Sequence, residues 1–422
     1  MRDLEEAWRQ GELVLLAPAE QQDLLAGSLE PDCWQALEER WGPGVVVASG
    51  GSSSMASGGR RWCLQPLSHL EASARATASW LNDQGIDPGR CWHWNPLPQY
   101  HVSGLLPQVR TRLWGARHCP IPAALLRNTG PALAQLPWSK EHPGLISLVP
   151  TQLARLLAVP EAVDWLRQLA VIWVGGAALP AQLAAEARRL ELPLAPCYGA
   201  TETAAMVCAL PPAQFLAGVC GCGLPLADVQ LRLAAADSAL AGSAVEVQSP
   251  RLSPGFLMAN SAGLQPLPLT ADGWWRSGDA GAITAAGLEL GGRLDGAINS
   301  GGETVFPEQL EASLKALAAA AGLPLAELLL VGLPEPAWGE RLVALVRADA
   351  GASAREGGGE GDAASEGGAR LIGDLAQLTL AWPAAERPRR WLICPQLAPT
   401  AAGKWQRGHW RSWAAQKLEK LA

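Results

Sequence analysis

Residues 144–153 read GLISLVPTQL, an apolar run that passes directly into proline and threonine. The run is typical of a buried strand, and Pro150 stands where the first turn of a helix accepts proline. The next segments repeat this pattern, because a glycine pair stops another apolar run at residues 169–174 and residues 180–190 then have helical spacing. Such alternation predicts an α/β fold with a largely parallel sheet.

The same alternation continues on both sides of this segment. Residues 44–48 form a short apolar strand, and residues 69–82 follow with helical spacing. From about residue 219 to residue 290 the elements shorten and turns multiply, as in a β-rich subdomain. We therefore expect a large N-terminal domain, residues 1–294, that combines α/β subdomains with a β-rich subdomain.

A smaller α+β domain is expected over residues 295–422. Residues 307–321 form an amphipathic helix, and two apolar runs after it, residues 328–331 and 342–346, predict strands. Residues 351–368 are rich in Gly, Ala, Ser and Glu and hold no large apolar side chain. That composition predicts a flexible surface loop.

Composition restricts the class of protein. The chain has 422 residues, 49% hydrophobic and 17% charged, with a net charge of −7 that argues against non-specific nucleic-acid binding. No apolar run reaches the roughly 18–20 residues of a membrane helix, and residues 1–20 lack the basic start of a secretory signal. Its nine cysteines show no metal-ligand spacing. We expect a soluble, cytoplasmic protein that binds a small molecule and neither nucleic acid nor membrane.

A glycine- and serine-rich loop at residues 49–54 is the first candidate site. Glycines let several backbone N–H groups point at one anion, and serine hydroxyls add donors. A flexible connector is an equally good interpretation of this loop alone. The phosphate-binding candidates are Ser49, Gly50, Gly51, Ser52 and Ser53, with Arg60 and Arg61 to neutralise charge.

The segment CYGATET, residues 197–203, is the second candidate. Thr201 and Glu202 offer oxygens for Mg²⁺ and phosphate, and the Tyr198 ring could stack on a base. The alternative is structural, with Thr201 or Thr203 capping the next segment.

Three further polar turns complete the set. Residues 275–279, WRSGD, are expected to form a turn that leaves Asp279 at a strand end, either as a cap or bound to vicinal ribose hydroxyls. Residues 292–303 form a glycine-dense turn around Arg293 at the expected domain boundary. Near the C-terminus, Lys404 follows glycine in a loop and is one of only five lysines.

In this order, the five segments resemble the adenylate-forming superfamily of acyl- and aryl-CoA synthetases, luciferases and adenylation domains. The resemblance implies ATP, Mg²⁺ and CoA. A carboxylate would attack the α-phosphorus of ATP, and the CoA thiol would then displace AMP from the acyl-adenylate. It also implies a mobile C-terminal domain that turns about Asp295 between the two steps.

The resemblance further implies a role for each matching residue. Lys404 would contact the α-phosphate, and Thr201 and Glu202 would serve phosphate and Mg²⁺. Asp279 would hold the ribose, assisted by Arg293. The loop at residues 49–54 would cradle the β,γ-phosphates. Adenine would meet Gly175, Gly176, Ala177 and Tyr198, with Gly199 beside it, and pantetheine would pass Gly301 and Gly302.

A narrower resemblance points to the o-succinylbenzoate–CoA ligases of menaquinone and phylloquinone synthesis. It rests on LPQYHVSGL, residues 97–105, and LVPTQL, residues 148–153, while RWCLQPL, residues 61–67, is similar to the cyanobacterial or plant type. His101 would shape the pocket for the aromatic acid, unless it is a satisfied buried residue. The second carboxylate of that acid needs a cation, and the candidates left open are Arg110, Arg112 and Arg117.

One departure from the family pattern keeps alternatives open. The family's phosphate loop continues into Pro-Lys-Gly, whereas residues 55–61 read MASGGRR. Arg60 and Arg61 are the candidates to supply the missing charge. The alternatives are another aryl- or acyl-CoA synthetase and, because of this loop, a catalytically silent nucleotide-binding protein.

Overall fold

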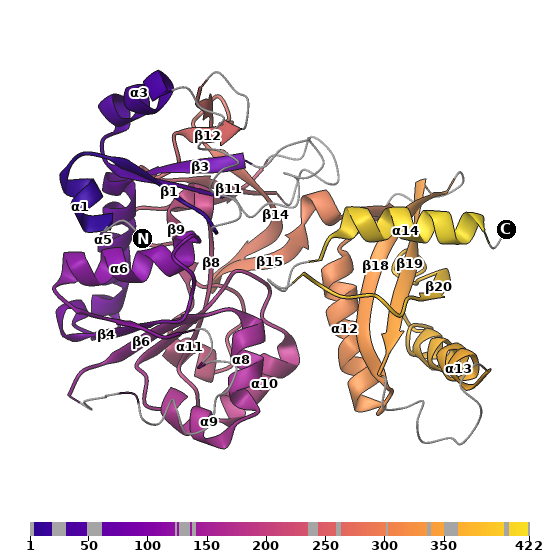
Figure 1. The fold of residues 1–422 in the computed structure, drawn as a ribbon. Coiled ribbons are helices and arrows are strands. Elements are labelled where there is room, and N and C mark those ends of the chain that lie inside the picture. Colours follow the sequence, from indigo (N-terminus) through magenta and orange to yellow (C-terminus); the bar gives the residue numbers. More distant parts are fainter. Residues whose placement is uncertain are drawn as a thin grey trace. The chain divides into compact units, whose positions relative to one another are not determined.

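The computed structural model describes residues 4–18, 31–48, 61–122, 125, 136, 141–234, 244–258, 263–300, 303–335, 339–349, 362–400 and 405–420. These residues fall into two compact units (Figure 1). The first unit runs to Leu290 without Gly278–Ala280, and the second holds those three residues and the chain from Gly291 onward. The hinge assigned to Asp295 stays a prediction.

A six-stranded sheet forms the centre of the first unit. Its order is β5-β4-β6-β7-β8-β9, and its neighbours are parallel except for the antiparallel β8 and β9. The predicted strands around residues 144 and 169 are confirmed as β6 and β7. The strands are β4 (Trp92–Asn95), β5 (Arg117–Pro120), β6 (Gly144–Leu148), β7 (Val171–Val174), β8 (Leu194–Ala200) and β9 (Ala205–Ala209).

Helices cover both faces of this sheet (Figure 1). Alternate residues of β7 enter different cores, since Trp173 packs with α5 and α6 while Ile172 packs with α8, α9 and α10. This two-sided burial explains the unbroken apolar runs and confirms the predicted α/β fold. The helices are α5 (Leu67–Asp83), α6 (Val102–Trp114), α8 (Pro150–Leu157), α9 (Pro160–Leu166), α10 (Ala181–Arg189) and α11 (Pro212–Leu216).

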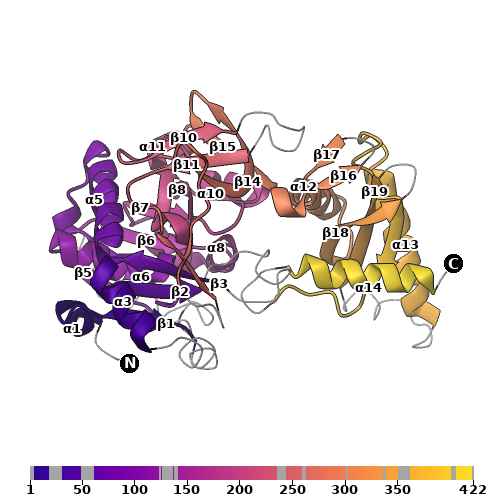
Figure 2. The same ribbon diagram turned by 90° about the horizontal axis from the view of Figure 1, so that it is seen from above.

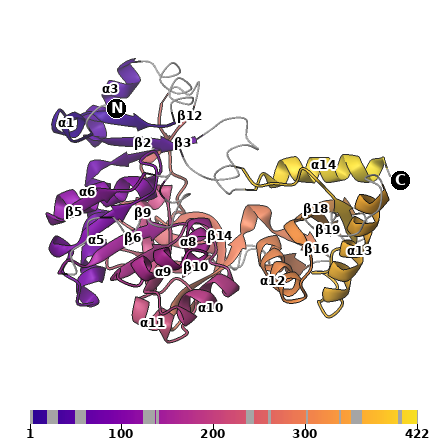
Figure 3. The same cartoon turned by 60° about the horizontal axis from the view of Figure 1, so that its bottom comes forward.

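A five-stranded sheet, in the order β1-β2-β3-β12-β13, brings distant segments together (Figure 3). Phe256 of β12 lies opposite Cys63 of β3 in an antiparallel ladder. Helix α3 packs on this sheet through Leu37. The elements are α1 (Leu4–Arg9), β1 (Leu13–Leu16), α3 (Pro31–Trp41), β2 (Gly44–Ala48), β3 (Arg61–Pro66), β12 (Gly255–Met258) and β13 (Gln265–Pro266).

The expected β-rich part contains a third sheet, in the order β10-β11-β14-β15. Here the expected turn before Asp279 is wrong, because Asp279 lies inside β14 rather than at a strand end. Gly278 takes a φ of +79°, which lets the strand bend locally while it stays paired with β15. The strands are β10 (Gln230–Leu233), β11 (Ala244–Gln248), β14 (Trp275–Thr284) and β15 (Gly287–Arg293).

The second unit is an α+β layer structure (Figure 2). Its sheet has the order β17-β16-β19-β18, with β20 parallel to β19. Helices α12 and α13 share one core with the sheet, and α14 shares another. The elements are β16 (Ile298–Ser300), β17 (Glu303–Val305), α12 (Pro307–Ala320), β18 (Leu325–Glu335), β19 (Gly339–Ala348), α13 (Asp362–Leu378), β20 (Arg390–Ile393) and α14 (Arg407–Glu419).

Helix α13 corrects the flexible loop expected at residues 351–368. The helix begins at Asp362, so residues 362–368 are helical. Leu371 and Leu375 are buried in the core that α13 shares with the sheet, and this packing carries the helix into a glycine-containing stretch. Residues 351–361 lie outside the described residues. Among the helices that the structure describes, none is long and apolar enough to cross a membrane.

Gly104 gives a test of how the first unit packs. A Cβ atom there would lie 2.1 Å from the carbonyl oxygen of Pro98 and 2.6 Å from that of Leu97. We expect Gly104→Ala to lower the free energy of unfolding by about 1–3 kcal/mol, measured as a lower thermal midpoint. The control is Gly373→Ala in α13, where nothing lies within 4 Å of the added Cβ. Equal midpoints for the two variants would contradict this packing.

Candidate functional site

Three predicted site segments meet at one edge of the six-stranded sheet. His101 follows β4, Gly175 begins the loop after β7, and Tyr198 lies near the end of β8. These strands are parallel, so their carboxyl ends share one edge, and that edge is where α/β sheets bind ligands. The structure therefore places these three segments at the same edge of one sheet.

Close packing shapes the loop after β7. A Cβ atom on Gly175 would lie 2.9 Å from the Cys197 sulfur, so the loop passes directly beside β8. Gly176 and Ala177 are exposed, while Tyr198 is only 9% exposed and packs in the core. The tyrosine ring thus contacts mainly protein, and its expected stacking on adenine stays a prediction.

The segment after β8 is a tight 3₁₀ turn, η2 (Thr201–Thr203), between two antiparallel strands. The buried Thr203 hydroxyl accepts the N–H of Ala200 at 3.0 Å and lies 2.6 Å from the carbonyl oxygen of Ala205, to which it donates. Thr203 therefore has the structural role, closing the turn. Thr201 and Glu202 are half-buried at the tip of the turn.

The turn's carbonyl groups accept hydrogen bonds from residues that sequence reasoning missed. Gln65 donates to Thr201 at 2.6 Å, and the buried Arg251 donates to Thr203. Both side chains are fully buried. In the sequence, Gln65 and Arg251 are only polar residues next to apolar runs, and that pattern does not predict which backbone groups they bind.

Asp279 and Arg293 are joined within the second unit. The Arg293 Nη1 atom lies 3.3 Å from Asp279 Oδ1, and both side chains are partly exposed. Gly278 leaves room for the guanidinium group, since an added Cβ would lie 3.4 Å from Arg293 Nη2. The structure thus pairs the two residues expected at the ribose.

Two arginines in or near the predicted site segments are described. Arg61 is described at the start of β3, with its guanidinium carbon 5.1 Å from the centre of the Phe256 ring. Arg407, three positions after the expected catalytic lysine, donates to Glu311 at 2.8 and 2.9 Å.

Several predicted site residues lie outside the described residues. They are Ser49, Gly50, Gly51, Ser52, Ser53, Arg60, Gly301, Gly302, Lys404 and the side chain of Asp295.

The three arginines considered for the second carboxylate have different surroundings. Arg112 is exposed and lies 2.6 Å from Glu71. Arg117 is exposed and stacks on Trp92, 4.0 Å from the ring centre. Arg110 is only 4% exposed, and it forms no ion pair with any carboxylate of the described residues. Arg110 is therefore the one buried cation of the three.

Arg110 belongs to a buried polar group against Trp173. Its guanidinium carbon lies 5.1 Å from the Trp173 ring centre, and the His93 ring lies 5.6 Å from the same ring. Arg110 Nε and both ring nitrogens of His93 have no hydrogen-bond partner among the described residues. Burial lowers the pKa of Arg110 to about 10, so the guanidinium stays charged at neutral pH. Unpartnered buried groups of this kind suit an anionic ligand.

Comparison with known proteins gives a consistent family. A family model described as AMP-binding enzyme matches residues 66–242. The 2-succinylbenzoate–CoA ligase of Enterococcus faecalis is 28% identical over 363 residues, which cover 85% of this chain and 68% of that protein. This chain spans about two thirds of the length of such curated relatives. These matches confirm the resemblance that the five motifs predicted.

Solved structures show the same fold. The o-succinylbenzoate CoA synthetase (MenE) of Bacillus subtilis, in complex with the acyl-adenylate OSB-AMP, aligns with a TM-score of 0.65 and 20% identity over 87% of this chain and 68% of that one. ATP-bound MatB from Rhodopseudomonas palustris aligns with a TM-score of 0.64 and 19% identity over 87% and 67%. At these identities the likeness concerns the fold.

Buried histidines predict how stability depends on pH. Burial is the main cause that lowers the pKa values of His69, His93 and His118, most strongly for His93. The unfolded chain then binds more protons as pH falls below about 6.5. We expect the first unit's unfolding midpoint to fall between pH 7 and pH 5, and less steeply in His93→Phe.

The exposed His409 of the second unit supplies the control for this pH series. His409→Gln should keep the parent's slope when the midpoint is measured by urea unfolding at each pH. A parental slope in His93→Phe would contradict the assignment of the proton uptake to His93.

Proposed function

Since the chain is a relative of the AMP-binding enzymes, we propose that it is an AMP-forming acid–thiol ligase for o-succinylbenzoate. The acid reacts with ATP to give an acyl-adenylate and pyrophosphate, and CoA then gives 2-succinylbenzoyl-CoA and AMP. The names of the curated relatives support this substrate. The product would serve menaquinone or phylloquinone synthesis.

The buried guanidinium of Arg110 is the observation that carries the choice of acid. A buried cation without a counter-ion is costly, and an anionic group of the substrate offsets that cost. Burial is the main cause that lowers the Arg110 pKa, and the Cys197 thiol, which opposes this shift, lies beside Gly175 at the carboxyl edge of the sheet. An acid with a second carboxylate therefore suits Arg110 better than a monocarboxylic acid.

The residues that the sequence assigned to ATP keep those roles in this proposal. Thr201 and Glu202 meet the phosphates, and the Asp279 carboxylate accepts hydrogen bonds from the ribose hydroxyls, with Arg293 keeping that carboxylate in place. Lys404 contacts the α-phosphate, where negative charge develops in the first step. Because phosphoryl chemistry depends on positioning and charge stabilisation, these residues act mainly by orientation.

Magnesium fits the donors at the turn. Glu202 and Thr201 offer a carboxylate and a hydroxyl, the oxygen ligands that Mg²⁺ prefers. No group of three or more His, Cys, Asp or Glu residues in the described ranges could hold a metal by itself. The ion would therefore share its ligands with the phosphates of ATP, as Mg²⁺ commonly does. When bound, it would neutralise phosphate charge.

The second half-reaction is assigned to the mobile second unit. Turning about Asp295 would withdraw Lys404 after adenylation and open a path for CoA, lined by Gly301 and Gly302 where larger side chains would obstruct pantetheine. The Arg407–Glu311 pair, with N–O distances of 2.8 and 2.9 Å, would keep the lysine segment attached to α12 during this motion.

Pyrophosphate release tests the proposed function. We expect release with ATP, Mg²⁺ and o-succinylbenzoate, and a CoA thioester when CoA is added. Benzoate and medium-chain fatty acids should support much less release, because they leave Arg110 without an anionic partner. Coupled pyrophosphate detection and mass spectrometry of the thioester give the two readouts.

Each other outcome of that assay has a defined meaning. Release with another acid would retain the ligase mechanism and replace the substrate. ATP binding without pyrophosphate release for every acid would contradict the proposed ligase activity and favour the silent nucleotide-binding protein. The MASGGRR segment, which departs from the family's phosphate loop, would then be the first segment to test.

Arg110→Lys tests the second-carboxylate site. Lysine keeps the charge but loses the fork of donors. The loss of a charged hydrogen bond predicts a rise of about ten- to a hundredfold in the KM for o-succinylbenzoate. The KM for benzoate, which lacks the second carboxylate, should stay unchanged.

The neighbouring arginine on α6 is the matched control for Arg110. Arg112→Lys alters an exposed ion pair with Glu71 and should leave the KM for both acids unchanged. An equal rise for both acids in Arg110→Lys would show that Arg110 supports the fold rather than the substrate.

A further inference from the structure

We propose that Arg251 is a positioning residue that holds the Thr201–Glu202 turn in its ATP-binding shape. This inference rests on the proposed function, because it concerns the turn assigned to phosphate and Mg²⁺. Arg251 does not touch those ligands itself. It acts through the backbone of the turn, from a segment about fifty positions later in the chain.

The Arg251 guanidinium is enclosed and fully engaged. Its side chain is 0% exposed and binds Asp228 through Nε at 2.7 Å and Nη2 at 3.3 Å. Nη2 also donates to the Met206 carbonyl at 2.8 Å, and Nη1 donates to the Thr203 carbonyl and to Ser73 Oγ at 3.5 Å. Asp228 thus orients the guanidinium, whose far side binds the backbone on both sides of Ala204.

The turn between those carbonyl groups has an unfavourable backbone conformation. Ala204 and Ala205 have φ angles of +50° and +75°, although neither is glycine. Left-handed conformations of such residues cost free energy and persist only where the surroundings enforce them. Thr203 and Met206 flank these alanines, so the two hydrogen bonds from Arg251 fasten both ends of the strained segment.

Two further contacts fasten the first half of the turn. Gln65 Nε2 donates to the Thr201 carbonyl at 2.6 Å, and the Ser253 N–H donates to the Glu202 carbonyl at 2.7 Å. Each of the three carbonyl groups of η2 therefore accepts a hydrogen bond from outside the turn. Because these hydrogen bonds fix the backbone of the turn, they also fix the positions from which the half-buried Thr201 and Glu202 side chains extend.

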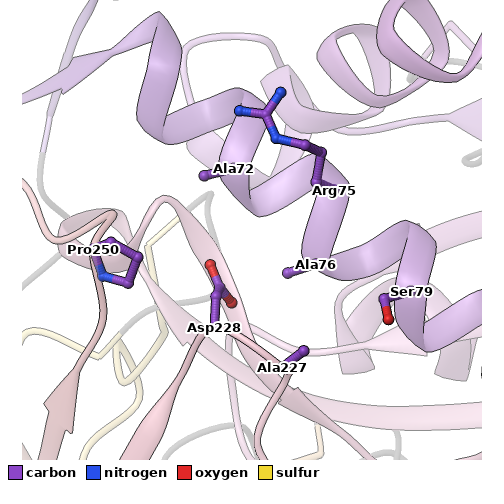
Figure 4. A pocket seen from close by; sticks show the side chains of 7 residues that line it. All are labelled: Ala72, Arg75, Ala76, Ser79, Ala227, Asp228 and Pro250. Carbon is purple, nitrogen blue, oxygen red and sulfur yellow. The ribbon is translucent and has the colours of Figure 1, made fainter.

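Of the Arg251–Asp228 ion pair, only the Asp228 carboxylate reaches the surface. Asp228 is 21% exposed and lines a pocket of about 330 Å³ between α5 and the segment that carries Pro250 (Figure 4). Ala72 and Ala76 form the helix side of this pocket. Water can reach the Asp228 carboxylate there, but it cannot reach the Arg251 guanidinium, so Arg251 has no solvent partner to replace its protein partners.

The test compares the two half-reactions in Arg251→Lys. A lysine carries its donors on one nitrogen, so it cannot reproduce the planar fork in which Nε, Nη1 and Nη2 of Arg251 each reach a different partner. Small displacements at a reacting centre can cost about a hundredfold in rate, so we expect adenylation to slow about ten- to a hundredfold. The KM for MgATP should rise, while the KM for o-succinylbenzoate and the conversion of supplied acyl-adenylate to thioester change less than about twofold.

Gln65→Met is the second variant, for the case that Arg251→Lys does not fold. It keeps the side-chain volume and removes one donor to Thr201. We expect a rise of about three- to tenfold in the KM for MgATP, with a thermal midpoint close to that of the parent. The activating Mg²⁺ concentration should shift upward in both variants, a change that loss of folding would not produce.

Arg188→Lys is the matched control. Arg188 also donates to two backbone carbonyl groups, those of Phe215 at 2.8 Å and Val219 at 3.0 Å, but it does not bind the turn. Its variant should keep the parent's KM for MgATP. An unchanged KM in Arg251→Lys and Gln65→Met, or a parallel loss of both half-reactions, would overturn the inference. Failure of the proposed function differs, because the parent itself would then release no pyrophosphate with o-succinylbenzoate.

Discussion

A buried charge that must be satisfied organises the first unit. Arg251 has no access to water, so its stability there depends on Asp228 and on carbonyl groups that point at it. Those carbonyl groups belong to the turn η2, at Thr203, and to the strand β9, at Met206. The requirement to partner one guanidinium therefore constrains the sheet edge where the phosphate-binding residues are expected.

In the proposed function, the sheet edge and the buried polar group serve different halves of one substrate complex. The turn at Thr201 and Glu202 faces the nucleotide in the proposed function, while Arg110 and His93 lie on the Trp173 side and face the acid. The two are linked through neighbouring strands, since Trp173, which Arg110 and His93 contact, lies on β7, and the turn follows β8, which pairs with β7. The two proposed recognition sites would thus rest on one sheet rather than on independent loops.

How far the sequence predicts this structure differs between residues. Apolar runs located β6 and β7, because burial on both faces leaves a local signature. Asp279 was misplaced, since small polar residues are typical of turns, and pairing of β14 with β11 and β15 keeps them in a strand. Arg251 escaped notice because its partners, such as Ser73 and Met206, are distant in sequence. Ser49–Ser53 and Lys404 lie outside the described residues, so their roles stay predictions.

The long sequence separation of the hydrogen bonds around the turn and Arg251 has a consequence for synthesis on the ribosome. The contacts that hold the turn join residues 136 positions apart at Gln65 and Thr201, and 178 positions apart at Ser73 and Arg251. A nascent chain that has not yet emerged beyond Arg251 contains β8 and the turn but lacks the donor that enforces their shape. Such long-range closure is slow, so the nucleotide-binding edge is expected to mature late, after the helices around it have formed.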